Sequence, residues 1–175
     1  HSHASECTDP THNHDDRQQT TAAKRFGIST FVYSRRKPFS VEKLQALVGS
    51  LPFVTASTAA GLELEDEKGG DGAAAAAEIF ESVLRSKGFL WLQGESGIAF
   101  YWSQAGKRLD LSEMGRWWAA VPRETWPQTH ADSILADFQG EHGDRRQELV
   151  FIGARMPEDR IVALLDDCLV SDSEI

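Results

Sequence analysis

Histidine and cysteine side chains near the start of the chain have the clearest potential for chemistry. Four imidazoles and one thiol fall within the first fourteen residues, at His1, His3, Cys7, His12 and His14. Imidazole nitrogen and thiolate sulfur are ligands that suit zinc, and a histidine-rich tract is a compositional sign of metal binding. The two histidine pairs have i, i+2 spacing, so a flexible segment can close each pair on one ion. This spacing differs from that of a structural zinc finger and predicts labile zinc binding.

A second interpretation of these histidines is a linker without a metal role, or tag residues at the extreme end. The other two histidines, His130 and His142, lie in polar stretches and are expected to be solvated. Cys168 falls on the apolar face of the last predicted helix, where a buried thiol behaves as a small hydrophobic side chain. The two cysteines lie at opposite ends of the chain, which argues against a disulfide and favours a reducing intracellular setting.

Sequence patterns for nucleotide binding and nucleophilic catalysis fail at individual positions. The Gly-Lys pair at 106–107 has Tyr101 where a phosphate loop requires its first glycine, and Arg108 where a hydroxyl should hold magnesium. The stretch that begins at Gly94 resembles a nucleophile elbow, but Ile98 stands where the second glycine is required. Without a cradle of backbone donors for phosphate, we expect no bound nucleotide and no catalytic residue in this chain.

Tryptophan and arginine side chains indicate a contact surface for another protein. Segment 116–118 falls in a predicted loop, and these two residue types are enriched at interaction hot spots. The arginine pair at 145–146 has two interpretations, because it can grip a carboxylate bidentately or neutralise an acidic surface. Packing in the core is expected for two other tryptophans, Trp91 and Trp102. The predicted interaction residues are Arg116, Trp117, Trp118, Arg145 and Arg146.

Composition divides the chain into a head, a domain and a short tail. Residues 1–23 are polar and lack a hydrophobic period, which predicts a disordered histidine-rich linker. A folded domain is expected over residues 24–170, with an acidic and glycine-rich insert at 55–72 that we also expect to be disordered. The acidic residues 171–175 are expected to fray. The chain starts at His1 without a methionine and is interpreted as a fragment of something longer.

Hydrophobic patterning predicts the elements of this domain. Ser40 is the expected N-cap of a helix that ends at Gly49, with Phe39 stapled onto Leu44. The alanine-rich run predicts a second helix over 73–87, capped by Gly88, and Pro157 opens a closing helix. A weakly helical stretch is expected around 134–138, and strands are predicted at 26–33, 89–92, 98–102, 108–111 and 148–152. This order predicts an α+β fold in which helices pack on one face of an antiparallel sheet of about four or five strands.

Four stretches in the second half carry a resemblance to a known family. Each sets an aromatic or β-branched run beside a glycine or an arginine, and they are Leu84–Trp91, Trp102–Gly106, Gly115–Pro122 and Gly143–Gly153. Together they look like the C-terminal domain of the CobW-type P-loop GTPases, a family of metal-insertion and metallochaperone proteins. The resemblance runs from about Arg25 to Val170, with an interruption at the insert.

The resemblance implies that two domains of a longer protein have different functions. In this family the N-terminal domain carries the phosphate loop, GTP hydrolysis and a cysteine-rich metal motif, and none of those residues has a counterpart in this chain. The C-terminal domain packs beside it and is thought to sense nucleotide state or engage client proteins. The expected function is therefore a non-catalytic regulatory and interaction domain of a GTP-dependent metal chaperone of the zinc or cobalt class. Its expected partners are the parent's GTPase domain and a client metalloprotein.

Charge and hydropathy exclude other classes of partner. The net charge of −9 argues against nucleic acid, since phosphate binding needs an excess of lysine and arginine. No apolar run approaches the roughly 18 residues of a membrane span, so we expect no membrane contact and a cytoplasmic location. Two alternatives stay open. One is a free-standing RNA- or protein-binding module without a metal role, with RNA bases stacked on the aromatic residues 100–102. The other is an enzyme of unrecognised mechanism.

Overall fold

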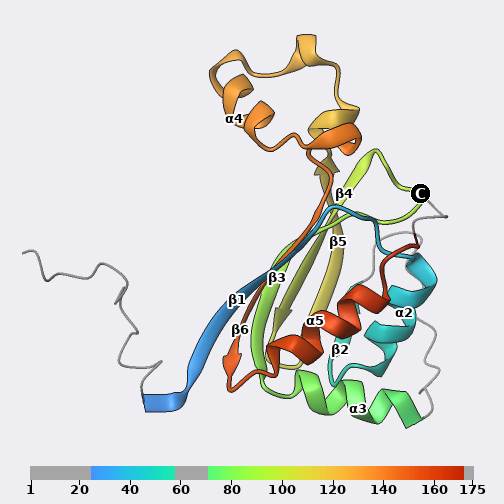
Figure 1. The fold of residues 1–175 in the computed structure, drawn as a ribbon, viewed down its shortest axis with the longest axis vertical. Coiled ribbons are helices and arrows are strands. Elements are labelled where there is room, and N and C mark those ends of the chain that lie inside the picture. Colours follow the sequence, from blue (N-terminus) through green and yellow to red (C-terminus); the bar gives the residue numbers. More distant parts are fainter. Residues whose placement is uncertain (1–24, 58–70, 172–175) are drawn as a thin grey trace, which may run out of the picture.

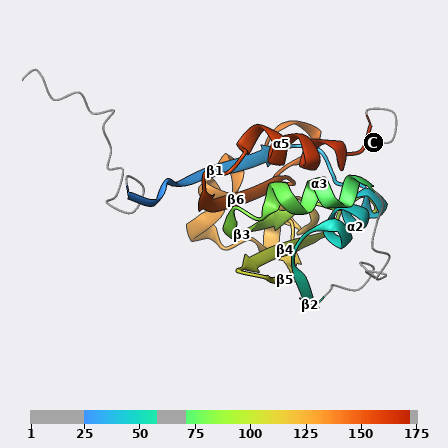
Figure 2. The same cartoon turned by 90° about the horizontal axis from the view of Figure 1, so that it is seen from below.

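A six-stranded sheet with helices on one face forms the domain (Figure 1). The computed structural model describes residues 25–57 and 71–171. Figure 2 shows α2, α3 and α5 on the same side of the strands. The predicted α+β class is thus confirmed. The strands are β1 Ile28–Arg35, β2 Val54–Ser57, β3 Val83–Leu90, β4 Ile98–Ala105, β5 Arg108–Arg116 and β6 Gln147–Ala154; the main helices are α2 Val41–Ser50, α3 Asp71–Phe80 and α5 Glu158–Asp167.

Strand order in the sheet is β1-β6-β3-β4-β5-β2. The hairpins joining β3, β4 and β5 form the predicted antiparallel meander, and β6 lies antiparallel between β1 and β3. The sixth strand, β2, lies parallel to β5, so the sheet is mixed and not wholly antiparallel. Residues 55–57 of β2 fall within the expected insert 55–72, because a strand of four residues is too short to show a clear alternation in the sequence.

The helix predicted over 73–87 is wrong in its second half. The helix α3 ends at Phe80, and the chain then enters β3 at Val83. Strand β3 is central and pairs with both β4 and β6, so its backbone groups are satisfied on two sides. Tertiary pairing therefore overrides the helix propensity of this segment. Gly88 is not a helix cap: a Cβ there would collide with the backbone carbonyl of Glu148 in β6.

The local signals for the first and last of these helices are confirmed. Ser40 is the N-cap of α2, and its Oγ accepts a hydrogen bond from the Lys43 N–H at 3.4 Å. Phe39 and Leu44 are both fully buried, as the staple requires. The helix continues through Gly49 to Ser50, one residue beyond the predicted end. Helix α5 begins directly after Pro157.

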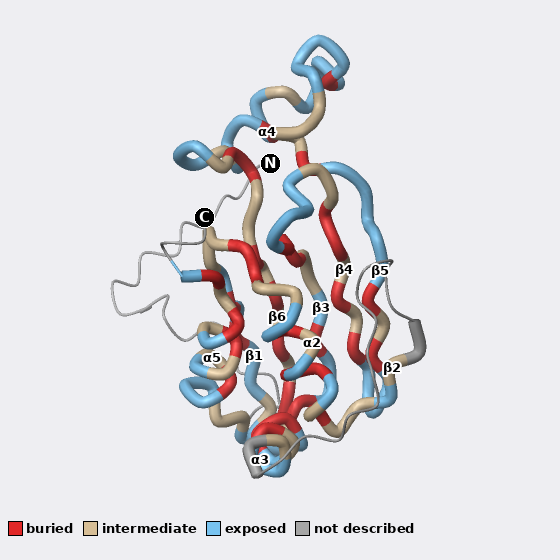
Figure 3. Tube along the Cα trace, turned by 90° about the vertical axis from the view of Figure 1, so that its right-hand side faces the viewer, coloured by how far each residue is buried: buried red, intermediate tan, exposed pale blue. Residues whose placement is uncertain are grey.

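The hydrophobic core lies between the sheet and the three helices, where Figure 3 shows buried positions along β6, β3 and β4. Trp102 is fully buried, and its Nε1 donates to Ser86 Oγ at 2.8 Å. Phe100 is 2% exposed on the same side, so neither ring is available to stack on RNA bases. Cys168 is 4% exposed, and burial raises the pKa of its thiol to about 12. This agrees with a small hydrophobic role for Cys168.

Polar contacts tie the end of α5 to strand β1. The Asp166 carboxylate accepts hydrogen bonds from the Tyr33 hydroxyl at 2.9 Å and from Arg35 Nη2 at 2.8 Å. Burial and the Asp166 carboxylate raise the pKa of the Tyr33 phenol, so this hydroxyl stays protonated and donates. Within the ranges 25–57 and 71–171, none of the helices has the length and apolar character needed to cross a membrane.

Candidate interaction site and metal ligands

The predicted interaction residues gather at one end of the sheet. The chain between β5 and β6 stands off that end as a separate group of short turns, which we call the excursion, residues 117–146 (Figure 1). Its only α-helix among the described residues is α4, Ala131–Ala136, which overlaps the stretch expected to be weakly helical around 134–138 but begins three residues earlier. The rest consists of the 3-10 turns η1 Trp118–Ala120, η2 Arg123–Thr125, η3 Gln128–His130 and η4 Gly140–His142.

Aromatic side chains give the excursion a small core of its own. The Trp118 and Trp126 rings meet edge to face with centroids 6.0 Å apart, and Phe138 lies 5.5 Å from Trp126. Trp126 is 8% exposed and its Nε1 donates to the Val121 carbonyl at 3.0 Å. The Arg123 guanidinium covers the outer side of the same indole at 5.6 Å. These contacts give a segment with little regular structure a defined shape.

Asp144 anchors the start of the excursion to its end. Its side chain is 4% exposed, and its two carboxylate oxygens accept from the backbone N–H groups of Trp118 and Ala119, both at 2.9 Å. A 3-10 turn leaves its first backbone donors free, and a carboxylate is a strong acceptor for them. No role for Asp144 is predicted from the sequence. The signal for one is its position beside Gly143, because glycine and aspartate are both favoured in turns and aspartate can bond to nearby backbone N–H groups.

Both arginines of the pair at 145–146 are engaged within the chain. Arg145 Nε donates to the Ser96 carbonyl at 2.6 Å, and its Nη1 donates to the His142 carbonyl at 3.0 Å. Arg146 Nε donates to Glu148 at 2.7 Å, and its Nη1 donates to the Asp144 carbonyl at 3.0 Å. A bidentate grip on an outside carboxylate would require these bonds to break. Arg146 neutralises Glu148, in line with the second interpretation, whereas Arg145 binds backbone carbonyls, a role that neither interpretation included.

The expectation of an exposed Arg-Trp-Trp segment needs correction. Arg116 is exposed, but Trp117 is only 4% exposed and packs edge to face against Phe89 with ring centroids 6.5 Å apart. Trp118 is half-buried in the aromatic cluster of the excursion. Trp117 is interior because β5 runs on through Arg116, which the short predicted strand at 108–111 did not allow for. Its indole nitrogen and that of Trp91 have no hydrogen-bond partner among the described residues.

Two cavities border the predicted interaction residues. One, of about 280 Å³, lies where the excursion meets the sheet, and its lining includes Arg116, Trp117, Trp118 and Arg146. The other, of about 330 Å³, lies within the excursion and is lined in part by Trp118, Trp126 and Arg145. The structure therefore brings these residues together around concave surfaces at one end of the domain.

The predicted zinc ligands lie outside the described residues. His1, His3, Cys7, His12 and His14 all fall in the stretch 1–24, so the proposed labile site stays a prediction. In the part of the chain that the structure describes, no group of three or more His, Cys, Asp or Glu side chains is placed to hold a metal ion. His130 is exposed, as expected, whereas His142 packs against Trp91 with ring centroids 5.0 Å apart.

Comparison with known proteins finds one matching domain family, a similar sequence and two similar structures. The domain family described as the cobalamin synthesis protein cobW C-terminal domain matches residues 28–169. The zinc-regulated GTPase metalloprotein activator 1 of Dictyostelium discoideum is 31% identical over 152 residues, which cover 86% of this chain but only 27% of that protein. The zinc-bound YjiA GTPase of E. coli shares the fold at 17% identity, with a TM-score of 0.50 over 86% of this chain and 32% of that one. A zinc-bound triple variant of YjiA gives a TM-score of 0.49 at the same identity, over 82% of this chain and 30% of that one.

Proposed function

The chain belongs to the family of cobW C-terminal domains, and we propose that it is the non-catalytic regulatory and interaction domain of a GTP-dependent metal chaperone. The observation that carries this proposal is the family match, which extends over residues 28–169 and so includes the whole sheet and α5. The metal class is zinc or cobalt, and the name of the Dictyostelium relative supports zinc. That relative is much longer than the matched region, which leaves room for a GTPase domain elsewhere.

A non-catalytic role agrees with the residues of this chain. The Gly-Lys pair at 106–107 forms the tight turn between β4 and β5, with Gly106 at φ 58° and Arg108 opening the next strand. It does not precede a helix, so it offers no helix N-terminus to a phosphate. GTP hydrolysis would then belong to the parent's own GTPase domain. Measurable hydrolysis of GTP by the purified chain would contradict this assignment.

The excursion supports a role in protein contact. Its half-buried Trp118 lies beside a cavity with Arg116 of β5, at an end of the sheet that α2, α3 and α5 leave free (Figure 1). A half-buried tryptophan at the rim of a concave surface resembles the anchors found at interaction hot spots. The partners we propose are the GTPase domain of the same parent protein and a client metalloprotein. We also propose a cytoplasmic location, which fits such partners.

The N-terminal histidines are proposed to handle zinc ions in transit. They combine ligands suited to zinc with a spacing too open for a structural site, so binding should be weak and reversible. Isothermal titration of zinc into the full chain and into a chain lacking residues 1–20 tests this proposal. The full chain should bind zinc and the shortened chain should not. A His130→Ala variant controls for histidines outside the head, and equal binding by the full and shortened chains would remove the metal role.

Titration against the parent's GTPase domain tests the contact role. Arg116→Glu and Trp118→Ala should each weaken binding by about tenfold or more, the loss typical of a hot spot. Arg160→Glu, at an exposed position of α5 that lines neither cavity, is the matched control and should change the affinity little. Equal affinity for all variants would exclude this surface as the contact.

A further inference from the structure

The face of the sheet opposite α2, α3 and α5 is not covered by any helix of the described residues, and we call it the open face. Burial alternates along the strands, with Leu149 and Phe151 buried toward the helices and Val150 and Ile152 on the other side. Strand register extends this assignment across the sheet, because residues paired between neighbouring strands lie on the same face. Two adjacent rows of the open face, each read from β1 to β5, are Val32, Val150, Lys87, Ser103 and Asp110, and then Thr30, Ile152, Arg85, Ala105 and Arg108.

Charged side chains on the open face occur at i and i+2 along single strands. On β5, Arg108 pairs with Asp110 through two hydrogen bonds at 2.9 and 3.2 Å. At the start of β6, Arg146 pairs with Glu148 at 2.7 Å. These two pairs are each neutral. The pair on the strand between them consists of two cations, Arg85 and Lys87, and neither has an ion pair or hydrogen bond within the described residues.

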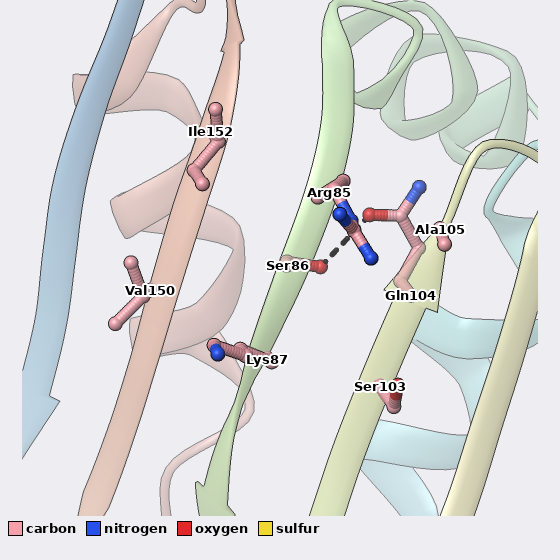
Figure 4. Close-up of a pocket in the computed structure, with 8 residues that line it drawn as sticks. All are labelled: Arg85, Ser86, Lys87, Ser103, Gln104, Ala105, Val150 and Ile152. Carbon is pink, nitrogen blue, oxygen red and sulfur yellow. Dashed lines mark hydrogen bonds between the residues drawn. The ribbon is translucent and has the colours of Figure 1, made fainter.

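Cross-strand neighbours do not supply the missing anions. Arg85 lies between Ile152 of β6 and Ala105 of β4, and Lys87 lies between Val150 and Ser103. Together they line a shallow depression of about 170 Å³, whose side chains Figure 4 shows. We call this depression the β3 strip. It has no acidic side chain in its lining, and the Glu148 carboxylate diagonal to Lys87 is already held by Arg146.

The β3 strip is positively charged, whereas the chain as a whole is negatively charged. The chain carries a net charge of −9, yet two exposed cations lie two residues apart on its central strand with uncharged cross-strand neighbours. A partner that supplies two carboxylates at the same spacing would complete two ion pairs here, in the manner of Arg108 and Asp110. The rise along a strand places same-face side chains about 7 Å apart. Carboxylates at i and i+2 of an extended peptide have the same spacing.

We propose that the β3 strip binds an extended acidic segment of a partner protein, with two carboxylates set two residues apart over Arg85 and Lys87. The peptide residue between the two carboxylates would point away from the sheet. The side chains of Val150 and Ile152 would pack against the methylene groups of the peptide's acidic side chains. A nucleic acid is disfavoured, because two unpaired cations would release too few counterions for useful affinity. The strip shares no residue with the predicted interaction site, so the inference goes beyond the proposed function and stands without it.

Titration of the ¹⁵N-labelled full chain with a short peptide tests the proposal. The probe is acetyl-Glu-Val-Glu-Val-Glu-amide, and its all-glutamine counterpart is the neutral control. We expect the acidic peptide to shift the amide signals of residues 85–87, 103–105 and 150–152, with millimolar affinity that weakens as salt is added. Each exposed ion pair contributes about two- to fivefold. The double variant Arg85→Gln with Lys87→Gln should therefore weaken binding about four- to 25-fold.

Matched variants and a second anion make the outcome decisive. Arg108→Gln removes a cation of the same face that is already paired with Asp110, so it should leave the peptide affinity within about twofold. Arg116→Glu alters the predicted interaction site at the end of β5 and should also have no effect, which separates the β3 strip from that site. Equal binding of the glutamine peptide, no binding by the acidic one, or an equal loss in Arg108→Gln would each overturn the proposal. Inorganic phosphate that binds as tightly as the peptide would show a small-anion site and overturn it as well.

Discussion

Asp144 should control the shape of the excursion more than any other single side chain. Asp144→Ala removes two hydrogen bonds to a carboxylate, each worth about 1.5–3 kcal/mol when the acceptor is charged. The freed N–H groups of Trp118 and Ala119 are only partly buried, so water will recover some of this free energy. We therefore expect the free energy of opening of the excursion to fall by about 2–4 kcal/mol. The sheet beneath should keep its stability, because both of these hydrogen bonds of the Asp144 carboxylate lie within the excursion.

Hydrogen exchange followed by NMR measures this opening residue by residue. A loss of 2–4 kcal/mol corresponds to about 30- to 700-fold less protection at the Trp118 and Ala119 amides. The amide of Phe151, in the fully buried part of β6, should keep its protection. Asp137→Ala is the control, since that carboxylate is 57% exposed and lies 3.6 Å from Arg146. Unchanged protection in Asp144→Ala would refute the anchoring role. An equal loss at Phe151 would refute the independence of the excursion.

Two further variants test the packing of the core. Gly88→Ala should destabilise the domain by about 3 kcal/mol or more in urea unfolding, because its Cβ meets the Glu148 carbonyl, whereas Gly97→Ala has open space and should stay within about 0.5 kcal/mol. In a Cys7→Ser background, Cys168 should react with iodoacetamide on the order of a thousandfold more slowly when folded than in urea, since burial raises the pKa of its thiol from 9.0 to about 12. The pKa of this thiol is higher in the folded state than in the unfolded state, so the protonated thiol stabilises the fold below about pH 9. That contribution to the free energy of unfolding is lost as the pH rises toward 12. Cys168→Ala should therefore make the stability of the domain fall less steeply between pH 9 and 12.

Local signals predicted the parts of the fold that short-range physics decides. The N-cap at Ser40, the staple of Phe39 and Leu44 and the helix after Pro157 all depend on residues within one or two turns. The meander was also predictable, because β4 and β5 are joined by a tight glycine turn at Gly106.

Long-range pairing decided what the sequence patterns missed. Val83 to Leu90 has a mixed helix and strand pattern, and only the presence of β4 and β6 on both sides makes it a strand. The burial of Trp117 likewise depends on Phe89, which lies 28 positions earlier in the chain. For the candidate site, the sequence identified the residue types and their grouping. It did not show that both arginines of the pair at 145–146 are already bonded within the chain.

The two borders of the sheet are unequal, and this limits how copies of the domain can associate. Strand β1 is eight residues long and regular, with Val32 57% exposed, whereas β2 has four residues and an irregular register. A long regular border invites strand addition from another molecule, and a short irregular one discourages it. Two copies joined through β1 would leave only the β2 borders outermost. Association by this route is therefore expected to stop at a dimer instead of growing into a fibre.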